Sequence, residues 1–102
     1  MNFFDRSDVS ETIKKNMQNE HTLGIRPEHL ISCAEAEACV SGKLELIENL
    51  GEYVLAHMVG SKGATFIAKM DRNLVGNIGD ILPFSVNDGN THWFDRTSTR
   101  RV

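Results

Sequence analysis

The stretch His21-Thr-Leu-Gly-Ile-Arg-Pro-Glu-His-Leu30 joins a short strand to a tight corner and is the most informative part of the chain. Leu23 and Ile25 lie two residues apart and would face the same side of a strand. Pro27 ends that strand, because proline has no N–H to donate to a ladder, and its fixed φ suits the first position of a helical turn. Glu28 suits the positive end of that turn. We therefore predict a strand that stops before Pro27 and is followed by one turn of helix.

Beyond residue 38, apolar residues recur at every second position, which is the pattern of β-strands. Strands are expected over residues 40–46, 53–59, 64–70, 79–86 and 92–95, with glycine-rich and asparagine-rich turns between them. Short strands at regular spacing favour a mainly β protein, a small closed or partly closed barrel of about five or six strands with one or two short helices. The periodicity alone would also allow a sandwich.

Two features should interrupt this regular pattern. In the first of these strands four residues would share one face: Val40, Gly42, Leu44 and Leu46. A bulge or bend is expected just after them, at residues 47–50, where the alternation changes. Pro83 should confine its own strand to an edge or a bulged position, because it cannot donate a ladder hydrogen bond.

Residues 1–20 differ from the rest and are expected to form an N-terminal junction segment, separate from a domain over residues 21–102. Asp8 and Glu11 are spaced as in a capping box. Val9, Ile13 and Met17 recur every fourth residue. This spacing predicts a short amphipathic helix over about residues 8–18.

Three segments carry a family resemblance, and they occur in the family's order. They are Leu23 to Leu30, then Glu48-Asn-Leu-Gly-Glu-Tyr-Val-Leu-Ala-His57, then His92-Trp-Phe-Asp95 followed by Thr97. Together they resemble the C-terminal regulatory domain of ATP-binding subunits in bacterial sugar-importing ABC transporters, called the transport-associated OB, or TOBE, domain. The residues that match the family motifs are Gly24, Ile25, Arg26, Pro27, Glu28, Gly51, Glu52, His92, Phe94 and Asp95.

This resemblance implies an OB-like barrel that works by contact with other proteins. It implies a non-catalytic regulatory and dimerisation domain of an importer for sugars, polyols or glycerol phosphate. The expected partners are a second copy of the chain, the ATPase domain, the membrane subunits and, in some members, a regulatory protein. The expected location is cytoplasmic, at the inner face of the membrane in the parent complex. Asn2-Phe3 resembles the passage from the ATPase domain, so the chain is expected to begin where that domain ends.

Composition argues against several other classes of protein. The chain has 14 acidic and 11 basic residues, and so lacks the basic surface that nucleic-acid binding needs. It also lacks the run of about 20 apolar residues that spans a bilayer. Two cysteines six positions apart and four dispersed histidines do not have the spacing of a metal site. We expect no metal, no cofactor, no nucleic-acid partner and no membrane insertion.

The segment Gly60-Ser-Lys-Gly-Ala-Thr65 has the residue types of a phosphate-binding loop but not its spacing. A nucleotide loop needs Gly-x-x-x-x-Gly-Lys-Ser/Thr ahead of a helix, and here a strand is expected after Ala64. A hairpin turn is therefore predicted. No spacing in the chain suggests a catalytic nucleophile or a paired acid and base. We expect no catalytic residues and no ATP hydrolysis by this chain.

Two further hypotheses concern binding. Some TOBE relatives bind molybdate or tungstate, and Ser61, Lys62 and Thr65 have side chains that suit such an oxyanion, so a stand-alone anion or metabolite sensor is the main alternative. A fragment with no independent role is a third reading.

Trp93 and Phe94 point to opposite faces of the last strand, and either one is a candidate interface anchor. Arg26 and Glu28 are expected to serve the corner's own geometry, not a ligand.

Overall fold

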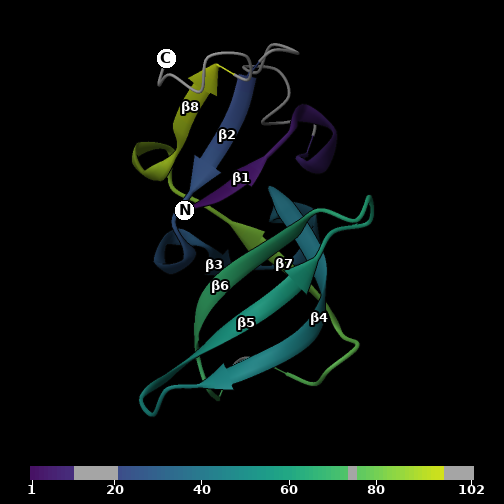
Figure 1. Cartoon of the computed structure of the whole chain (residues 1–102), viewed down its shortest axis with the longest axis vertical. Helices are drawn as coiled ribbons and strands as arrows, with labels where there is room; N and C mark the ends of the chain where they lie inside the picture. The colour runs from purple at the N-terminus through teal and green to yellow at the C-terminus, as the bar shows by residue number, and fades with distance from the viewer. Residues whose placement is uncertain (11–20, 74–75, 96–102) are drawn as a thin grey trace.

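The computed structural model describes residues 1–10, 21–73 and 76–95, which form eight strands and four short 3₁₀ turns (Figure 1). The side chains of Arg6, His21, Asp88, Trp93, Phe94 and Asp95 lie outside this description. The elements in chain order are β1 (Asn2–Phe4), η1 (Arg6–Asp8), β2 (His21–Ile25), η2 (Pro27–His29), β3 (Ile31–Ser32), η3 (Glu35–Glu37), β4 (Val40–Asn49), β5 (Tyr53–Val59), β6 (Thr65–Asp71), β7 (Ile81–Ser85), η4 (Asp88–Asn90) and β8 (His92–Asp95).

The strands form two antiparallel sheets. The smaller has the order β1-β2-β8, and the larger has the order β3-β7-β4-β5-β6 and curls into a half-barrel, so the predicted mainly β, OB-like architecture is confirmed (Figure 1). β4 is the longest strand: its first residues pair with β7 and its remainder pairs with β5. This sharing bends the sheet. The described part of the chain has more strands than the five or six expected, because β1 and β3, which are three and two residues long, are additional.

The predicted corner is confirmed. β2 ends at Ile25, and Pro27 opens the 3₁₀ turn η2 as its first residue. His29 N donates to Arg26 O at 3.0 Å and closes the turn. η2 packs against β6, so it helps to cover the edge of the half-barrel. Leu30 then enters the core.

The irregularity in β4 lies earlier than predicted. The register pairs Leu44 with Met58 and Leu46 with His57, so Glu45 is an extra residue in the strand. A one-residue bulge reverses the alternation of side chains. Leu46 therefore points outward and is 54% exposed, whereas Ile47 packs against the core. The expectation that Leu46 shares the buried face of Leu44 is wrong, as is the placement of the bend at residues 47–50.

Pro83 does not lie in an edge strand, which corrects the second expectation. β7 lies between β3 and β4 in the sheet. β3 contributes only Ile31 and Ser32, which pair with Ser85 and Phe84, so its ladder ends before Pro83 is reached. A ladder hydrogen bond from Pro83 is not needed at that position. Pro83 is accommodated because the ladder with the short strand β3 ends before it, although β7 is not an edge strand.

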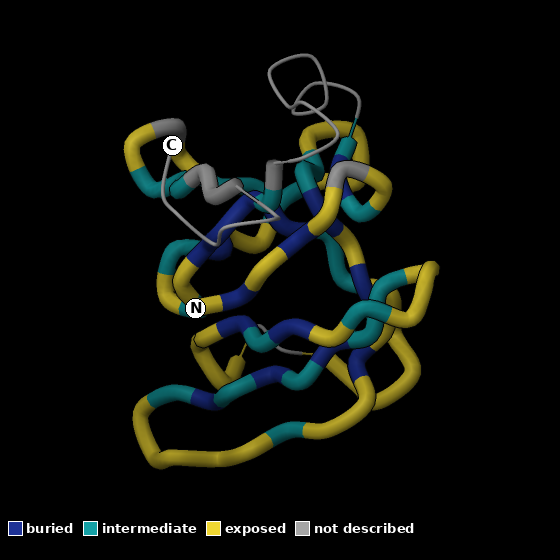
Figure 2. Tube along the Cα trace, turned by 45° about the horizontal axis from the view of Figure 1, so that its top comes forward, coloured by how far each residue is buried: buried dark blue, intermediate teal, exposed yellow. Residues whose placement is uncertain are grey.

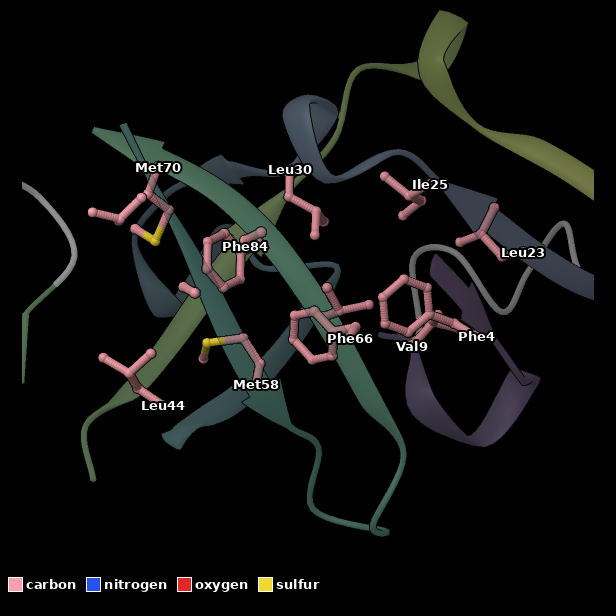
Figure 3. Packing of buried hydrophobic residues seen from close by; sticks show 14 residues of the cluster. Phe4, Val9, Leu23, Ile25, Leu30, Leu44, Met58, Phe66, Met70 and Phe84 are labelled. Atoms are coloured by element: carbon pink, nitrogen blue, oxygen red, sulfur yellow. The ribbon is translucent and has the colours of Figure 1, made fainter. Parts of the chain in front are cut away.

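The hydrophobic core joins the two sheets (Figures 2 and 3). Three aromatic rings lie in a row: Phe4 and Phe66 have centroids 5.1 Å apart, and Phe66 and Phe84 have centroids 6.1 Å apart, both edge to face. Gly42 makes room for the middle ring, because a Cβ at that position would lie 2.9 Å from the Phe66 ring. Among the described residues, fourteen buried apolar residues form this core: Phe4, Val9, Leu23, Ile25, Leu30, Val40, Leu44, Val54, Ala56, Met58, Phe66, Ala68, Met70 and Phe84.

The N-terminal segment contributes to this core through Phe4 and Val9. Asp5 N donates to the Asp8 carboxylate at 3.0 Å. The capping box is therefore formed by Asp5 and Asp8, three residues before the predicted pair of Asp8 and Glu11. Most of the helix predicted over residues 8–18 lies outside the described residues. The described part of it, residues 8–10, ends the turn η1 and then runs extended at Val9.

Candidate interaction surface

The outward side chains of β4, β5 and β6 form a continuous surface, here called the outer face. The ladder registers arrange it in three rows across the strands. The first row is Lys43, Val59 and Thr65; the second is Leu46, His57 and Ile67; the third is Glu48, Leu55 and Lys69. Each row has a half-buried residue of β5 at its centre, and the third row has opposite charges, Glu48 and Lys69, on its flanking strands.

Leu46 is the most prominent apolar group of the outer face. It is 54% exposed, whereas Leu55, Val59 and Ile67 are half-buried by their neighbours. The bulge at Glu45 is the cause, because it turns the leucine outward from a strand whose preceding apolar residues all point inward. The result is an isolated leucine that stands on the β4 side of the face.

A hollow of about 620 Å³ crosses the same face from β4 to β6. Phe3 and Met1, from the N-terminal segment, form one wall of it, and Phe3 remains 55% exposed. Residues of β5 and β6, among them Val59 and Ile67, line its floor, and Glu45 on β4, next to Leu46, borders it on the other side.

The N-terminal strand is held beside this hollow by the side chain of Asn2. Asn2 Nδ2 donates to Ile67 O at 2.6 Å, and Ile67 N donates to Asn2 Oδ1 at 2.8 Å. The amide thus pairs with β6 as a strand residue would, and Asn2 is buried. These bonds satisfy an N–H and a C=O on the outer edge of β6, which would otherwise be open to pairing with another chain. They also fix Phe3 at the border of the outer face.

Two polar contacts shape the charges of the outer face. The Glu48 carboxylate contacts His57 Nε2 on the neighbouring strand. Lys69 Nζ lies 4.2 Å from the centroid of the Tyr53 ring, which is a cation–π contact. Glu48 and Lys69 therefore carry opposite charges at the two ends of one row, separated by Leu55.

The motif residues of the corner serve its structure. Gly24 pairs with Phe3 on one side and with His92 on the other, in the middle of the small sheet, and Ile25 is fully buried. Arg26 and Glu28 are exposed. A hydrogen bond from its own backbone N–H holds the pKa of the Glu28 carboxyl below its usual value, with smaller contributions from the charges nearby. That bond places the charge at the N-terminal end of η2, as predicted from the sequence.

The remaining motif residues do not converge on the corner. Gly51 has φ of 100°, which favours glycine, and Gly51 N donates to Asn49 Oδ1 at 3.0 Å within the turn between β4 and β5. Glu52 is exposed in the same turn, at the opposite end of the molecule from β8 in Figure 1. Phe94 and Asp95 pair with β2 through their backbone. The side chains of Trp93, Phe94 and Asp95 lie outside the described residues, so the interface role of Trp93 and Phe94 stays a prediction.

The three anion-binding candidates lie at the hairpin between β5 and β6, and all three are exposed. The predicted turn is present: Gly60 N donates to Ala64 O at 2.7 Å, and Gly63 N donates to Gly60 O at 2.9 Å. Ser61 lines a groove of about 590 Å³ in which Asp8, Glu35 and Glu45 outnumber Lys43. Thr65 instead lines the hollow beside Phe3. The acidic residues of that groove would oppose an anion beside Ser61.

The described residues include no group of three or more His, Cys, Asp or Glu side chains arranged to hold a metal ion. Among the same residues, no helix is long and apolar enough to cross a membrane. Cys33 and Cys39 are both half-buried thiols outside any disulfide. The outer face is the most distinctive surface of the described part of the molecule.

Comparison with known proteins gives the class to which this OB-like fold belongs. No family model matches the chain. Curated relatives do: the chain is homologous to the C-terminal region of ATP-binding subunits of ABC importers for sugars and glycerol phosphate, and the resemblance found in the sequence is confirmed.

Two relatives illustrate this homology. The sn-glycerol-3-phosphate import ATP-binding protein UgpC of Ralstonia nicotianae is 34% identical over 84 residues, which cover 81% of this chain and 23% of that protein. The maltose/maltodextrin import ATP-binding protein MalK of Vibrio parahaemolyticus is 31% identical over 80 residues, which cover 78% of this chain and 22% of that protein. The chain therefore spans somewhat less than a quarter of the length of these relatives.

Two residues that shape the surface are not marked as such by the sequence. Asn2 belongs to a segment with a family resemblance, and its side chain closes the edge of β6. Leu46 was expected in the core and is instead the exposed residue on β4. Leu46 continues the alternation of Val40, Gly42 and Leu44, so no local signal marks the bulge that turns it outward.

Proposed function

We propose that the chain is a TOBE-type regulatory and dimerisation domain of the ATP-binding subunit of an ABC importer for sugars, polyols or glycerol phosphate. It acts through contacts between proteins and performs no chemistry of its own. Homology to the C-terminal region of such subunits supports the transport context. The observation that carries the contact role is the outer face, a broad surface with exposed apolar groups and mixed charge.

The proposed partners follow from this context. A second copy of the chain pairs with it, and in the parent subunit the ATPase domain and the membrane subunits lie alongside. A regulatory protein is a further partner in some systems. The proposed location is the cytoplasmic face of the inner membrane. Because the partners are proteins, the domain contributes to assembly and its control, and the solute is selected elsewhere in the importer.

Titration calorimetry combined with light scattering tests this function. The chain is titrated with Mg-ATP, molybdate, sulfate, glycerol 3-phosphate and maltose in turn, and its mass is followed as its own concentration is raised. We expect no binding heat with any small molecule and a mass that rises with protein concentration. Micromolar binding of molybdate or sulfate, lost in Lys62→Ala, would favour the anion sensor. Hydrolysis of ATP would contradict the non-catalytic assignment.

A further inference from the structure

We propose that the hollow beside Phe3 binds an extended segment of another protein in which an apolar residue is followed, two positions later, by an arginine or lysine. This inference rests on the proposed function, in which the domain acts through contacts between proteins, and it adds a site and the chemistry of the partner. The hollow has a volume of about 620 Å³, which is within the range of ligand-binding sites.

The apolar part of the hollow selects the first residue of the segment. Phe3 is 55% exposed and forms a wall, and Val59 and Ile67 lie half-buried in the floor. An apolar side chain placed against them would remove hydrocarbon surface of both proteins from water. The two bonds between Asn2 and Ile67 hold Phe3 at this border, so the wall is formed before a partner arrives.

The charge at the other border selects the second residue. Glu45 is exposed, and within the described part of the chain its carboxylate takes part in no hydrogen bond or ion pair. The Glu48 carboxylate, in contrast, contacts His57. Lys43 lines the groove on the other side of Glu45 and not this hollow. An unpaired carboxylate beside apolar surface is complementary to a cation on a long apolar stem, which is an arginine or lysine side chain.

The width of the hollow sets the spacing of the two residues. β4 and β6 lie on either side of β5, and two strand separations amount to about 10 Å. In an extended segment, side chains two positions apart lie on one face, about 6.6 Å from each other, and the stem of an arginine or lysine covers the remaining distance. Because Asn2 already bonds Ile67 N and O, the segment does not add to β6 as a further strand there and binds through its side chains.

NMR titration of the chain with short blocked peptides tests this site. The probe is N-acetyl-Leu-Thr-Arg-amide, and its controls are N-acetyl-Leu-Thr-Glu-amide, which reverses the charge, and N-acetyl-Ser-Thr-Arg-amide, which removes the apolar side chain. All three are added at one low protein concentration, so that pairing of copies does not contribute. We expect the probe to shift the amides of Glu45, Val59 and Ile67, and each control to bind at least several-fold more weakly.

Two variants separate the roles of the carboxylate and the wall. Glu45→Gln should remove the preference for the arginine probe over the glutamate control, and it keeps an exposed polar side chain of similar size, so the fold is retained. Glu52→Gln is the matched control, because Glu52 is an exposed carboxylate in the turn before β5 and does not line the hollow. Phe3→Ser should weaken both leucine peptides alike, since it removes the apolar wall. Added salt should weaken the probe more in the wild type than in Glu45→Gln.

Three results would overturn this site and leave the proposed function in place. Equal binding of the arginine and glutamate peptides, or a preference that survives Glu45→Gln, would show that Glu45 does not select a cation. Shifts that are absent at millimolar probe, or that fall elsewhere in the chain, would remove the hollow as the site. Shifts of Val59 and Ile67 with protein concentration but not with the probe would make a second copy the occupant. Binding of molybdate or sulfate, by contrast, would count against the proposed function itself.

Discussion

Gly42 shows at the scale of one residue how the β4 strand accepts the aromatic core. Its missing side chain gives space to the Phe66 ring, which in turn contacts Phe4 from the other sheet. Gly42→Ala should lower the free energy of unfolding by about 1–3 kcal/mol, because the ring must move from a packed position. Urea denaturation measures this change. Gly89→Ala is the control, since a Cβ there meets no atom within 4 Å and should change stability little.

Glu28 gives a prediction about pH. The pKa of its carboxyl is held below the usual value, mainly by the hydrogen bond from its own backbone N–H, so the ionised form is favoured in the folded state. That stability is fully present above the unfolded pKa of about 4.3 and is lost as pH falls through the lower folded pKa. Glu28→Gln should therefore lower the melting temperature slightly at pH 7.

The difference between Glu28→Gln and the wild type should close as pH falls through the lowered pKa of the folded state, where the carboxyl becomes protonated in both states. Thermal unfolding followed by circular dichroism across this range measures it. Glu52→Gln, at an exposed position in the turn before β5, serves as the comparison. A difference of constant size at all pH values would mean that the charge of Glu28 is not what stabilises the turn.

At the scale of elements, β1 and β6 are joined by one side chain and not by a ladder. Asn2→Ala would leave Ile67 N and Ile67 O without their partner, and we expect a loss of about 1–3 kcal/mol in unfolding free energy. Asn2→Asp should also destabilise the fold, because its carboxylate keeps the acceptor but cannot donate to Ile67 O. Denaturant unfolding measures both changes.

Asn77→Ala is a suitable control for these variants, because Asn77 is exposed. Equal stability of Asn2→Ala and Asn77→Ala would show that the Asn2 amide does not hold β1 to the edge of β6. A larger loss in Asn2→Ala, together with increased aggregation, would support its role in closing that edge.

The elements also show what a sequence can and cannot predict. The corner at Pro27 and the five main strands were predictable, because proline chemistry and apolar alternation act over a few residues. The bulge at Glu45, the short β3 beside Pro83 and the pairing of Asn2 with Ile67 were not. Each depends on which strand lies alongside, and that information comes from residues up to 65 positions away.

At the scale of the whole molecule, the two sheets enclose one core (Figure 2), and in the described part of the chain the side chains on the outer face of β4, β5 and β6 are exposed or half-buried. The family segments indicated the class of protein, and one of them, Glu48 to His57, also contributes Glu48, Leu55 and His57 to this face. The others lie at the corner and in β8, where they build the fold. Leu46, the most exposed apolar residue on β4, lies outside these segments.

The central claim, that the chain works by contact with a copy of itself and not by binding a small ligand, is tested most directly by amide NMR spectra. The spectra are recorded as the protein concentration is raised, and again after addition of molybdate or sulfate. The account predicts shifts with concentration for Leu46, Leu55 and Ile67, and no shifts with either anion. Spectra that are independent of concentration, with anion-induced shifts around Ser61 and Lys62, would contradict it.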